Sequence, residues 1–168
     1  IHDVALQKLP VTFAMDRAGF VGEDGETHMG LYDIAYMLSV PNMTVAAPKD
    51  STEMLGLLRT ALSHHGPFAL RYARVPAPDL APPMSDVAAV PVGTWEVLRP
   101  GREIAVLALG PMVQQALHAA DTLSAEGLDI TVVNCRYLKP YDEVTLHALC
   151  AHHRILLTVE EGTVVNGF

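Results

Sequence analysis

The residue types best suited to chemistry are gathered in one short stretch, residues 16–30. It holds Arg17, His28 and several carboxylates among four glycines. Glycine lets a backbone approach a ligand closely, and the stretch follows an apolar run at 11–15 that is typical of a buried strand. In open α/β sheets ligands bind outside the carboxyl ends of the strands. The sequence therefore predicts a ligand site in this loop.

Two arginines, Arg17 and Arg74, each come at or just beyond the end of an expected strand. The carboxyl ends of parallel strands meet at one edge of a sheet, so we expect the two guanidinium groups to lie near each other. Arginine binds phosphate through paired hydrogen bonds, which points to an anion site. Alternatively, each arginine pairs with a nearby carboxylate such as Asp16 or Asp33. Spacing alone leaves both interpretations open.

His28 and Asp24 are the other candidates in the loop. A loop histidine with acidic neighbours can act as an acid, a base or a hydrogen-bond donor near neutral pH, although a plain surface histidine fits the pattern equally well. The two side chains could instead be metal ligands. One histidine with scattered carboxylates is a weak metal signal, however, and the EF-hand pattern is missing. The sequence therefore assigns no metal ligand.

Alternating elements must position these residues. Strands are expected at 11–15, 44–47 and 68–72, with a helix at 32–40 and another that begins at the capping box of Asp50 to Glu53. Alternation of this kind favours parallel strand pairing. It predicts an α/β first domain over residues 1–75.

A proline-rich stretch, residues 76–91, lacks periodicity and is predicted to be a linker. The alternation of strands and helices then resumes over residues 92–168, which predicts a second α/β domain. The expected fold class is two mainly parallel-sheet domains, both truncated. The chain starts at Ile1 and stops just after an expected strand and turn, and we interpret it as an internal piece of a longer polypeptide.

Composition narrows the function classes. The 168 residues are 50% apolar and 18% charged, with a net charge of −8, which is typical of a soluble globular protein. An acidic chain disfavours nucleic-acid binding, and no apolar run is long enough to cross a bilayer. Cys135 and Cys150 match no metal or disulfide motif. We therefore expect a cytoplasmic protein whose partners include neither nucleic acid nor membrane.

The block DRAGFVGEDGETHMG at residues 16–30 resembles 1-deoxy-D-xylulose-5-phosphate synthases, a branch of the transketolase-like enzymes. The stretches GPFALRY at 66–72 and YLKPYD at 137–142 fit the same family, and the resemblance covers nearly the whole chain. It implies most of a pyrimidine-binding domain followed by part of a transketolase C-terminal-like domain.

This resemblance implies a transferase that depends on thiamine diphosphate (thiamine pyrophosphate) and magnesium. Such enzymes condense pyruvate with glyceraldehyde 3-phosphate to 1-deoxy-D-xylulose 5-phosphate and CO₂, which feeds isoprenoid, thiamine and pyridoxal biosynthesis. They are homodimers. The family's ligands for the cofactor and the metal lie upstream of this chain, so no cofactor-binding residue is assigned and we expect the isolated chain to be inactive.

The resemblance also implies residue roles. Arg17 and Arg74 would hold the aldehyde phosphate, His28 would donate to the substrate carbonyl or the intermediate's oxygen, and Asp24 would bind a substrate hydroxyl. One departure concerns the loop of Arg74, where Ala73 and Val75 replace the family's usual proline and glycine. This departure raises the question of whether Arg74 still points into the site.

Three other functions stay open from the sequence. They are a β-type subunit of a 2-oxo acid dehydrogenase, another transketolase-like enzyme, and a non-catalytic α/β module. Arg17 and Arg74 discriminate between the first and the synthase, because a phosphosugar enzyme needs them and a lipoyl-transfer enzyme does not. Intact Asp24 and His28 argue against the non-catalytic module.

Overall fold

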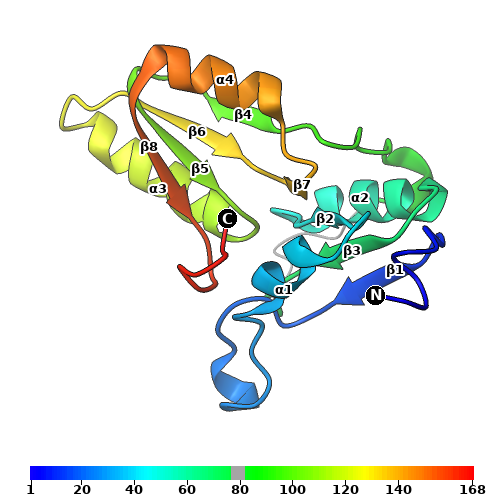
Figure 1. The fold of residues 1–168 in the computed structure, drawn as a ribbon. Coiled ribbons are helices and arrows are strands. Elements are labelled where there is room, and N and C mark those ends of the chain that lie inside the picture. The colour runs from blue at the N-terminus through cyan, green and yellow to red at the C-terminus, as the bar shows by residue number, and fades with distance from the viewer. Residues whose placement is uncertain (77–81) are drawn as a thin grey trace.

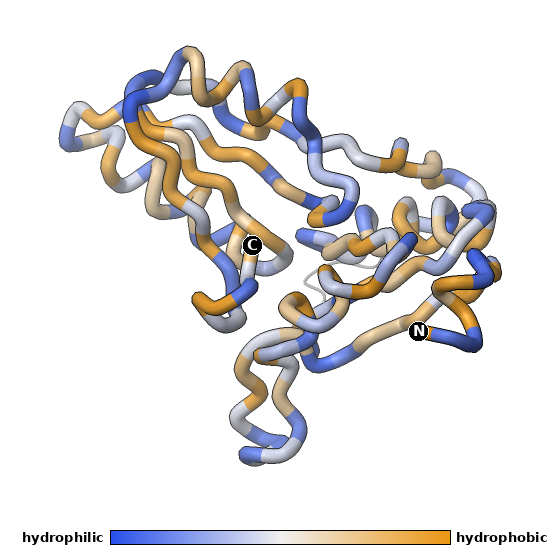
Figure 2. Tube along the Cα trace, viewed as in Figure 1, coloured by the Kyte–Doolittle hydropathy of each residue, from blue (hydrophilic) through white to orange (hydrophobic). Residues whose placement is uncertain are grey.

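The computed structural model describes residues 1–76 and 82–168. The described residues form two four-stranded sheets, which lie in neighbouring units (Figure 1). The expected class, two mainly parallel sheets with helices, is confirmed. Apolar residues are concentrated on the strands (Figure 2). Within the described residues, no helix combines the length and apolarity that crossing a membrane would need.

The first sheet has the strand order β1-β3-β2-β7. Strands β1 (Thr12–Met15) and β2 (Thr44–Ala46) pair in parallel with the central strand β3 (Phe68–Arg71). Successive side chains of a strand point to opposite faces. Accordingly Val45 and Ala69 pack in the cluster that contains Ile34 of helix α1 (Asp33–Ser39), on one face of the sheet.

Helix α2 (Ser51–Ser63) covers the other face of this sheet. Its Leu57 and Ala61 pack against Phe68 and Leu70 of β3. The predicted cap is present, because the Asp50 carboxylate accepts a hydrogen bond from the Glu53 N–H at 2.7 Å. The Glu53 side chain reaches back one residue further than a standard capping box and accepts from the N–H of Lys49 at 2.7 Å.

The second sheet has the order β4-β6-β5-β8. Strands β5 (Glu103–Ala108), β6 (Ile130–Asn134) and β8 (His153–Val159) run parallel, and the edge strand β4 (Glu96–Arg99) runs antiparallel to β6. The sheet is therefore mainly parallel, and one of its two edge strands is antiparallel.

Two helices cover the faces of this second sheet. Helix α3 (Met112–Ser124) packs Val113 and Ala116 against one face, and helix α4 (Glu143–His152) packs Leu149 against the other. The exposed edge is β8, where Leu157 keeps 52% of its surface accessible.

Strand β7 (Tyr137–Lys139) lies in the range that the sequence assigns to the second domain, yet it pairs antiparallel with β2 of the first sheet. The Lys139 ammonium then donates to the carbonyl oxygens of Leu38 and Val40, at 2.9 and 2.7 Å. A cation suits the carbonyl end of a helix, here the end of α1. The two halves are thus joined by a shared sheet as well as by the stretch at 76–91, and the domain boundaries stay a prediction.

Candidate active site

The predicted loop, residues 16–30, leaves the carboxyl end of β1 and projects from the body of the protein (Figure 1). Its two ends are held together by backbone hydrogen bonds, from the Gly30 N–H to the Arg17 carbonyl at 2.8 Å and from the Gly19 N–H to the Gly30 carbonyl at 3.0 Å. A single 3-10 turn, Gly22–Asp24, lies inside the loop. The loop is therefore fixed at its base while its tip stands in solvent.

The bases of the two arginines are adjacent because the β1–β3 pairing continues past both strands. The Tyr72 N–H donates to the Met15 carbonyl at 2.9 Å, and the Ala18 N–H donates to the Tyr72 carbonyl at 3.0 Å. Arg17 and Arg74 flank this extension. This is the edge at which the sequence places them.

Arg17 and Arg74 converge on one carboxylate, that of Asp24. Arg17 Nε donates to Asp24 Oδ2 at 2.6 Å, and a terminal nitrogen of Arg74 donates to Asp24 Oδ1. Arg17 also pairs with Asp16, and Arg74 lies 3.9 Å from Glu23. The sequence left open whether these arginines bind an anion or pair with neighbouring carboxylates, and in this structure they do the latter.

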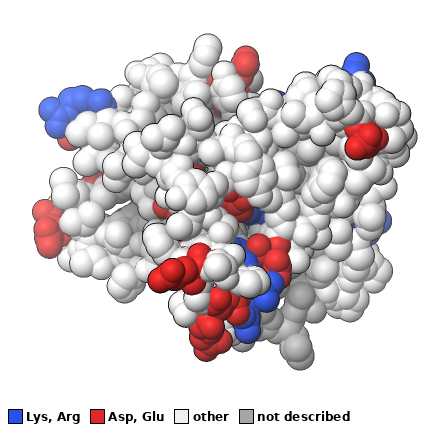
Figure 3. Space-filling view, turned by 60° about the horizontal axis from the view of Figure 1, so that its bottom comes forward, with Lys and Arg blue, Asp and Glu red and all other residues white. Residues whose placement is uncertain are grey.

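In Figure 3, acidic and basic side chains gather on the face of the protein from which the loop projects. The pKa of Asp24 is lowered below its usual 3.8, most by the hydrogen bond from Arg74 and next by that from Arg17. The hydrogen bond to Asp24 in turn raises the pKa of Arg74. Asp24 and Arg74 are therefore both charged at neutral pH. Arg74 points into this cluster although Ala73 and Val75 flank it.

A hollow of about 430 Å³ opens beside the cluster. Arg74 lines it with residues from the loop and from the segment after β3. It lies at the carboxyl edge of the sheet, where α/β proteins bind ligands. The full lining is Phe20, Val21, Gly22, Glu23, Arg74, Val75 and Pro76.

His28 stands apart from the three charged residues. It is exposed, two residues before Gly30 at the loop base, and its Nδ1 lies 2.9 Å from the Thr27 hydroxyl oxygen. Among the described residues no other hydrogen-bond partner of its ring is found. The structure thus brings Arg17, Asp24 and Arg74 together and leaves His28 at the edge of the site.

Arg71, the last residue of β3, is buried beside the loop. Its side chain is 3% exposed and its Nε donates to Asp33 Oδ2 at 2.8 Å. One terminal nitrogen also donates to the carbonyl oxygens of Gly30, at 3.1 Å, and Glu161, at 2.6 Å. Arg71 therefore ties the loop, helix α1 and the end of β8 to one another. The signal in the sequence that could have identified Arg71 is a charged residue at the end of an otherwise apolar strand.

A second contact between the loop and the end of β8 involves Gly19. Its φ is +78°, and a Cβ added there would lie 2.7 Å from Cβ of Glu161. Only glycine fits this close approach without displacing the neighbour. Burial raises the pKa of Glu161 and of Glu160, whose carboxylate accepts from the Phe168 N–H at 3.1 Å. The second half of the chain thus forms part of the support for the loop.

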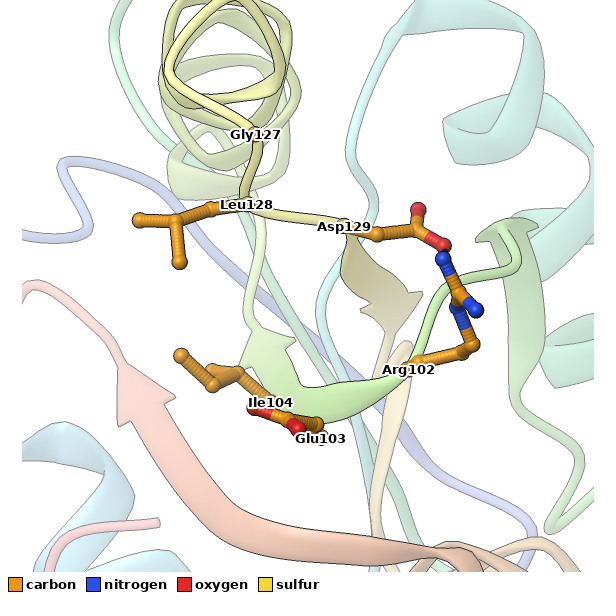
Figure 4. A pocket seen from close by; sticks show the side chains of 6 residues that line it. All are labelled: Arg102, Glu103, Ile104, Gly127, Leu128 and Asp129. Carbon is orange, nitrogen blue, oxygen red and sulfur yellow. Dashed lines mark hydrogen bonds and ion pairs between the residues drawn. The ribbon is translucent and has the colours of Figure 1, made fainter.

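Another hollow, of about 310 Å³, lies at the amino end of β5 and is lined by Arg102, Glu103, Ile104 and the segment 127–129 (Figure 4). Arg102 Nε contacts Asp129 Oδ2 at 3.2 Å, and the Arg102 side chain is 85% exposed. The carboxyl edges of the sheets, not the amino ends, hold the candidate residues. We therefore do not assign this hollow to the site.

Two family models match the chain. "Transketolase, pyrimidine binding domain" covers residues 1–78, and "Transketolase, C-terminal domain" covers residues 93–168. Among solved structures, a split-gene transketolase described as an inactive β4 tetramer superposes with a TM-score of 0.85 at 33% identity, covering 98% of this chain and 52% of that one. A transketolase from Pichia stipitis, at 24% identity and a TM-score of 0.77, shares the fold.

Curated relatives are more similar in sequence. The 1-deoxy-D-xylulose-5-phosphate synthase of Aquifex aeolicus is 50% identical over 168 residues, which are 100% of this chain and 26% of that protein. The corresponding synthase of Parasynechococcus marenigrum is 47% identical over the same share of each chain. The chain thus spans about a quarter of the length of the curated relatives it matches.

Proposed function

We propose that this chain, which belongs to the transketolase family, is a segment of a 1-deoxy-D-xylulose-5-phosphate synthase. Such an enzyme condenses pyruvate with glyceraldehyde 3-phosphate and releases CO₂. The observation that supports the proposal most is that Arg17 and Arg74 lie close enough to share one carboxylate, that of Asp24, at the carboxyl edge of a sheet. That geometry suits the phosphate of the aldehyde substrate.

Phosphate recognition is the part of the reaction that these residues would perform. Two guanidinium groups can each donate charge-assisted hydrogen bonds to a phosphate, and the pair fixes the position of the whole substrate. The neighbouring hollow of about 430 Å³ would take the rest of the aldehyde. In this proposal His28 donates to the carbonyl oxygen on which negative charge develops, and Asp24 accepts from a substrate hydroxyl.

Thiamine diphosphate, when bound, would supply the nucleophilic carbon and the electron sink. Within residues 1–76 and 82–168, no group of three or more His, Cys, Asp and Glu side chains is arranged to hold a metal ion. The resemblance places the family's ligands for the cofactor and the metal upstream of this chain, so we assign none of the described residues to either. For that reason we expect the isolated chain to be inactive.

Magnesium dependence, a homodimeric assembly and a cytoplasmic location belong to the same proposal. The first two rest on the resemblance carried by residues 16–30, and the third rests on the composition and the two cysteines. The names of the curated relatives support the synthase over a dehydrogenase subunit. No contact in the described residues favours the dehydrogenase or the non-catalytic module.

Arg74→Ala in the complete protein that carries this segment tests the proposal. A hydrogen bond to a charged group contributes about 1.5–3 kcal/mol, so kcat/KM for glyceraldehyde 3-phosphate should fall about ten- to a hundredfold. Pyruvate decarboxylation should fall less, because pyruvate has no phosphate. Steady-state rates with each substrate varied give both values.

Arg99→Ala is a matched control for this experiment. Arg99 also pairs with an aspartate, Asp121, but it lies in the second sheet. Its loss should leave both rates nearly unchanged. Equal losses for the two substrates in Arg74→Ala would contradict the phosphate role, and a complete protein that forms no product would contradict the proposed function itself.

A further inference from the structure

The carboxylate of Asp24 fills the space between two guanidinium groups. One of its oxygens accepts from Arg17 and the other accepts from Arg74. Each arginine donates to a separate oxygen, which is also how two arginines would divide the oxygens of a phosphate. Asp24 therefore occupies the position that a bound anion would take.

We propose that Asp24 is an internal competitor for this anion site, so that a phosphate binds only by displacing the Asp24 carboxylate from Arg17 and Arg74. The inference rests on the proposed function and adds a selection step to it. An anion that interacts with the arginines no better than an aspartate gains nothing by binding, whereas a phosphate dianion carries twice the charge. Asp24 would therefore exclude simple carboxylates, including that of pyruvate, and admit phosphates.

The surroundings of Asp24 allow the displacement. The side chains of Arg17 and Arg74 are 34% and 48% exposed, so water and a dissolved anion reach both of them. Asp24 lies in a short turn between Gly22 and Gly25, and a Cβ added at either glycine would meet nothing within 4 Å. No neighbouring atom therefore packs against the turn at these two glycines.

Displacement would also give Asp24 its second role. Once the phosphate takes the two arginines, the carboxylate loses both donors and must find other hydrogen bonds. A hydroxyl of the same substrate is such a donor. Phosphate binding would thus be coupled to the exposure of a hydrogen-bond acceptor, which is available only when a phosphorylated ligand is present.

Inorganic phosphate is the probe that tests this. Its affinity for the complete protein is measured by calorimetry for the unaltered chain, for Asp24→Asn and for Asp24→Ser. Removing the competitor frees charge-assisted donors, so we expect phosphate to bind about tenfold more tightly to both variants. Acetate, which the unaltered chain should reject, should bind measurably to both.

Glu26→Gln is the matched control, since it removes the same charge from an exposed side chain of the same loop that does not line the hollow. It should change phosphate affinity less than threefold, in keeping with the small energies of exposed pairs. Arg74→Ala in the Asp24→Asn background should abolish the gain. Circular dichroism confirms that each variant is folded.

The outcomes separate the two proposals. Phosphate binding that depends on Arg74 but is no tighter in Asp24→Asn and Asp24→Ser than in Glu26→Gln would overturn the competitor role and leave the anion site intact. Absence of phosphate binding in every variant would overturn both the competitor role and the proposed function.

Discussion

Two arginine–aspartate pairings lie near each other at the carboxyl edge of the first sheet, and they differ in burial. Arg71 and Asp33 are 3% and 5% exposed. Arg74 and its partner Asp24 are 48% and 16% exposed. Only three positions separate the two arginines in the sequence, and yet one side chain turns into the protein and the other turns toward the hollow.

Burial determines what each pairing can do. A buried charge that loses its partner has no water to replace it, so a buried pair is held in place by the cost of separating it. An exposed pair exchanges its partner for water or for a dissolved anion at little cost. The pairing of Arg71 therefore suits a structural role, and that of Arg74 suits ligand binding.

The largest expected effect comes from breaking the buried pair. Arg71→Met leaves the Asp33 carboxylate buried without its partner, which should lower the free energy of unfolding by about 3–5 kcal/mol. Arg74→Ala should lower it far less, because an ion pair that is open to water contributes little to stability. Urea unfolding of the protein followed by circular dichroism measures both. Similar losses for the two variants would erase the distinction between the pairs.

A smaller effect is expected where the loop meets the end of β8. Gly19→Ala places a Cβ 2.7 Å from Glu161 in a backbone with φ of +78°, and it should destabilise the protein by about 1–3 kcal/mol. Gly25→Ala is the control, because Gly25 has a similar φ, +72°, and open space around it. Gly25→Ala should therefore lose only the stability that the strained backbone costs. If unfolding in urea shows the same loss for both variants, the contact with Glu161 contributes nothing.

The smallest expected effect is on how the stability of the fold depends on pH. The pKa of Asp24 is lowered by its arginines, so the stability that it contributes is complete above its unfolded pKa of 3.8 and is lost as the pH falls through the still lower folded pKa. Burial raises the pKa of Glu160 above 4.5, so its contribution has the opposite sign and stability falls as the pH rises through that raised value.

Urea unfolding at a series of pH values separates these two groups. Asp24→Asn should remove part of the pH dependence below 3.8 and leave the region above 4.5 unchanged. Glu160→Gln should do the reverse. If both variants lose their pH dependence over the same pH range, the two pKa shifts cannot belong to Asp24 and Glu160 separately.

Local patterns in the sequence predict much of the fold. The strand expected at 11–15 is observed at Thr12–Met15, and the strand expected at 68–72 is observed at Phe68–Arg71. The cap at Asp50 starts helix α2. These features depend on neighbouring residues, namely apolar runs and a side chain that bonds the first turn of its own helix. A single sequence therefore carries them.

Features that depend on distant residues could not be predicted. Strand β7 has only three residues, and its partner β2 lies about ninety positions earlier. The orientation of Arg71 is set by Asp33 and by the carbonyl of Glu161, neither of which is close in sequence. The grouping of Arg17 with Arg74 was expected from the parallel sheet, but their shared partner Asp24 depends on how the loop folds back. The roles of these residues stay predictions.

Strand β7 has a consequence for how genes of this kind can be divided or recombined. A cut in the stretch at 76–91 would separate β2 from the strand that covers its edge, and Lys139 from the helix end that it caps. A recombination crossover there would combine the first half of one gene with the β7 and Lys139 of another. Compatible exchanges would therefore have to carry Tyr137–Lys139 together with the first half, and the two regions should have changed together during evolution.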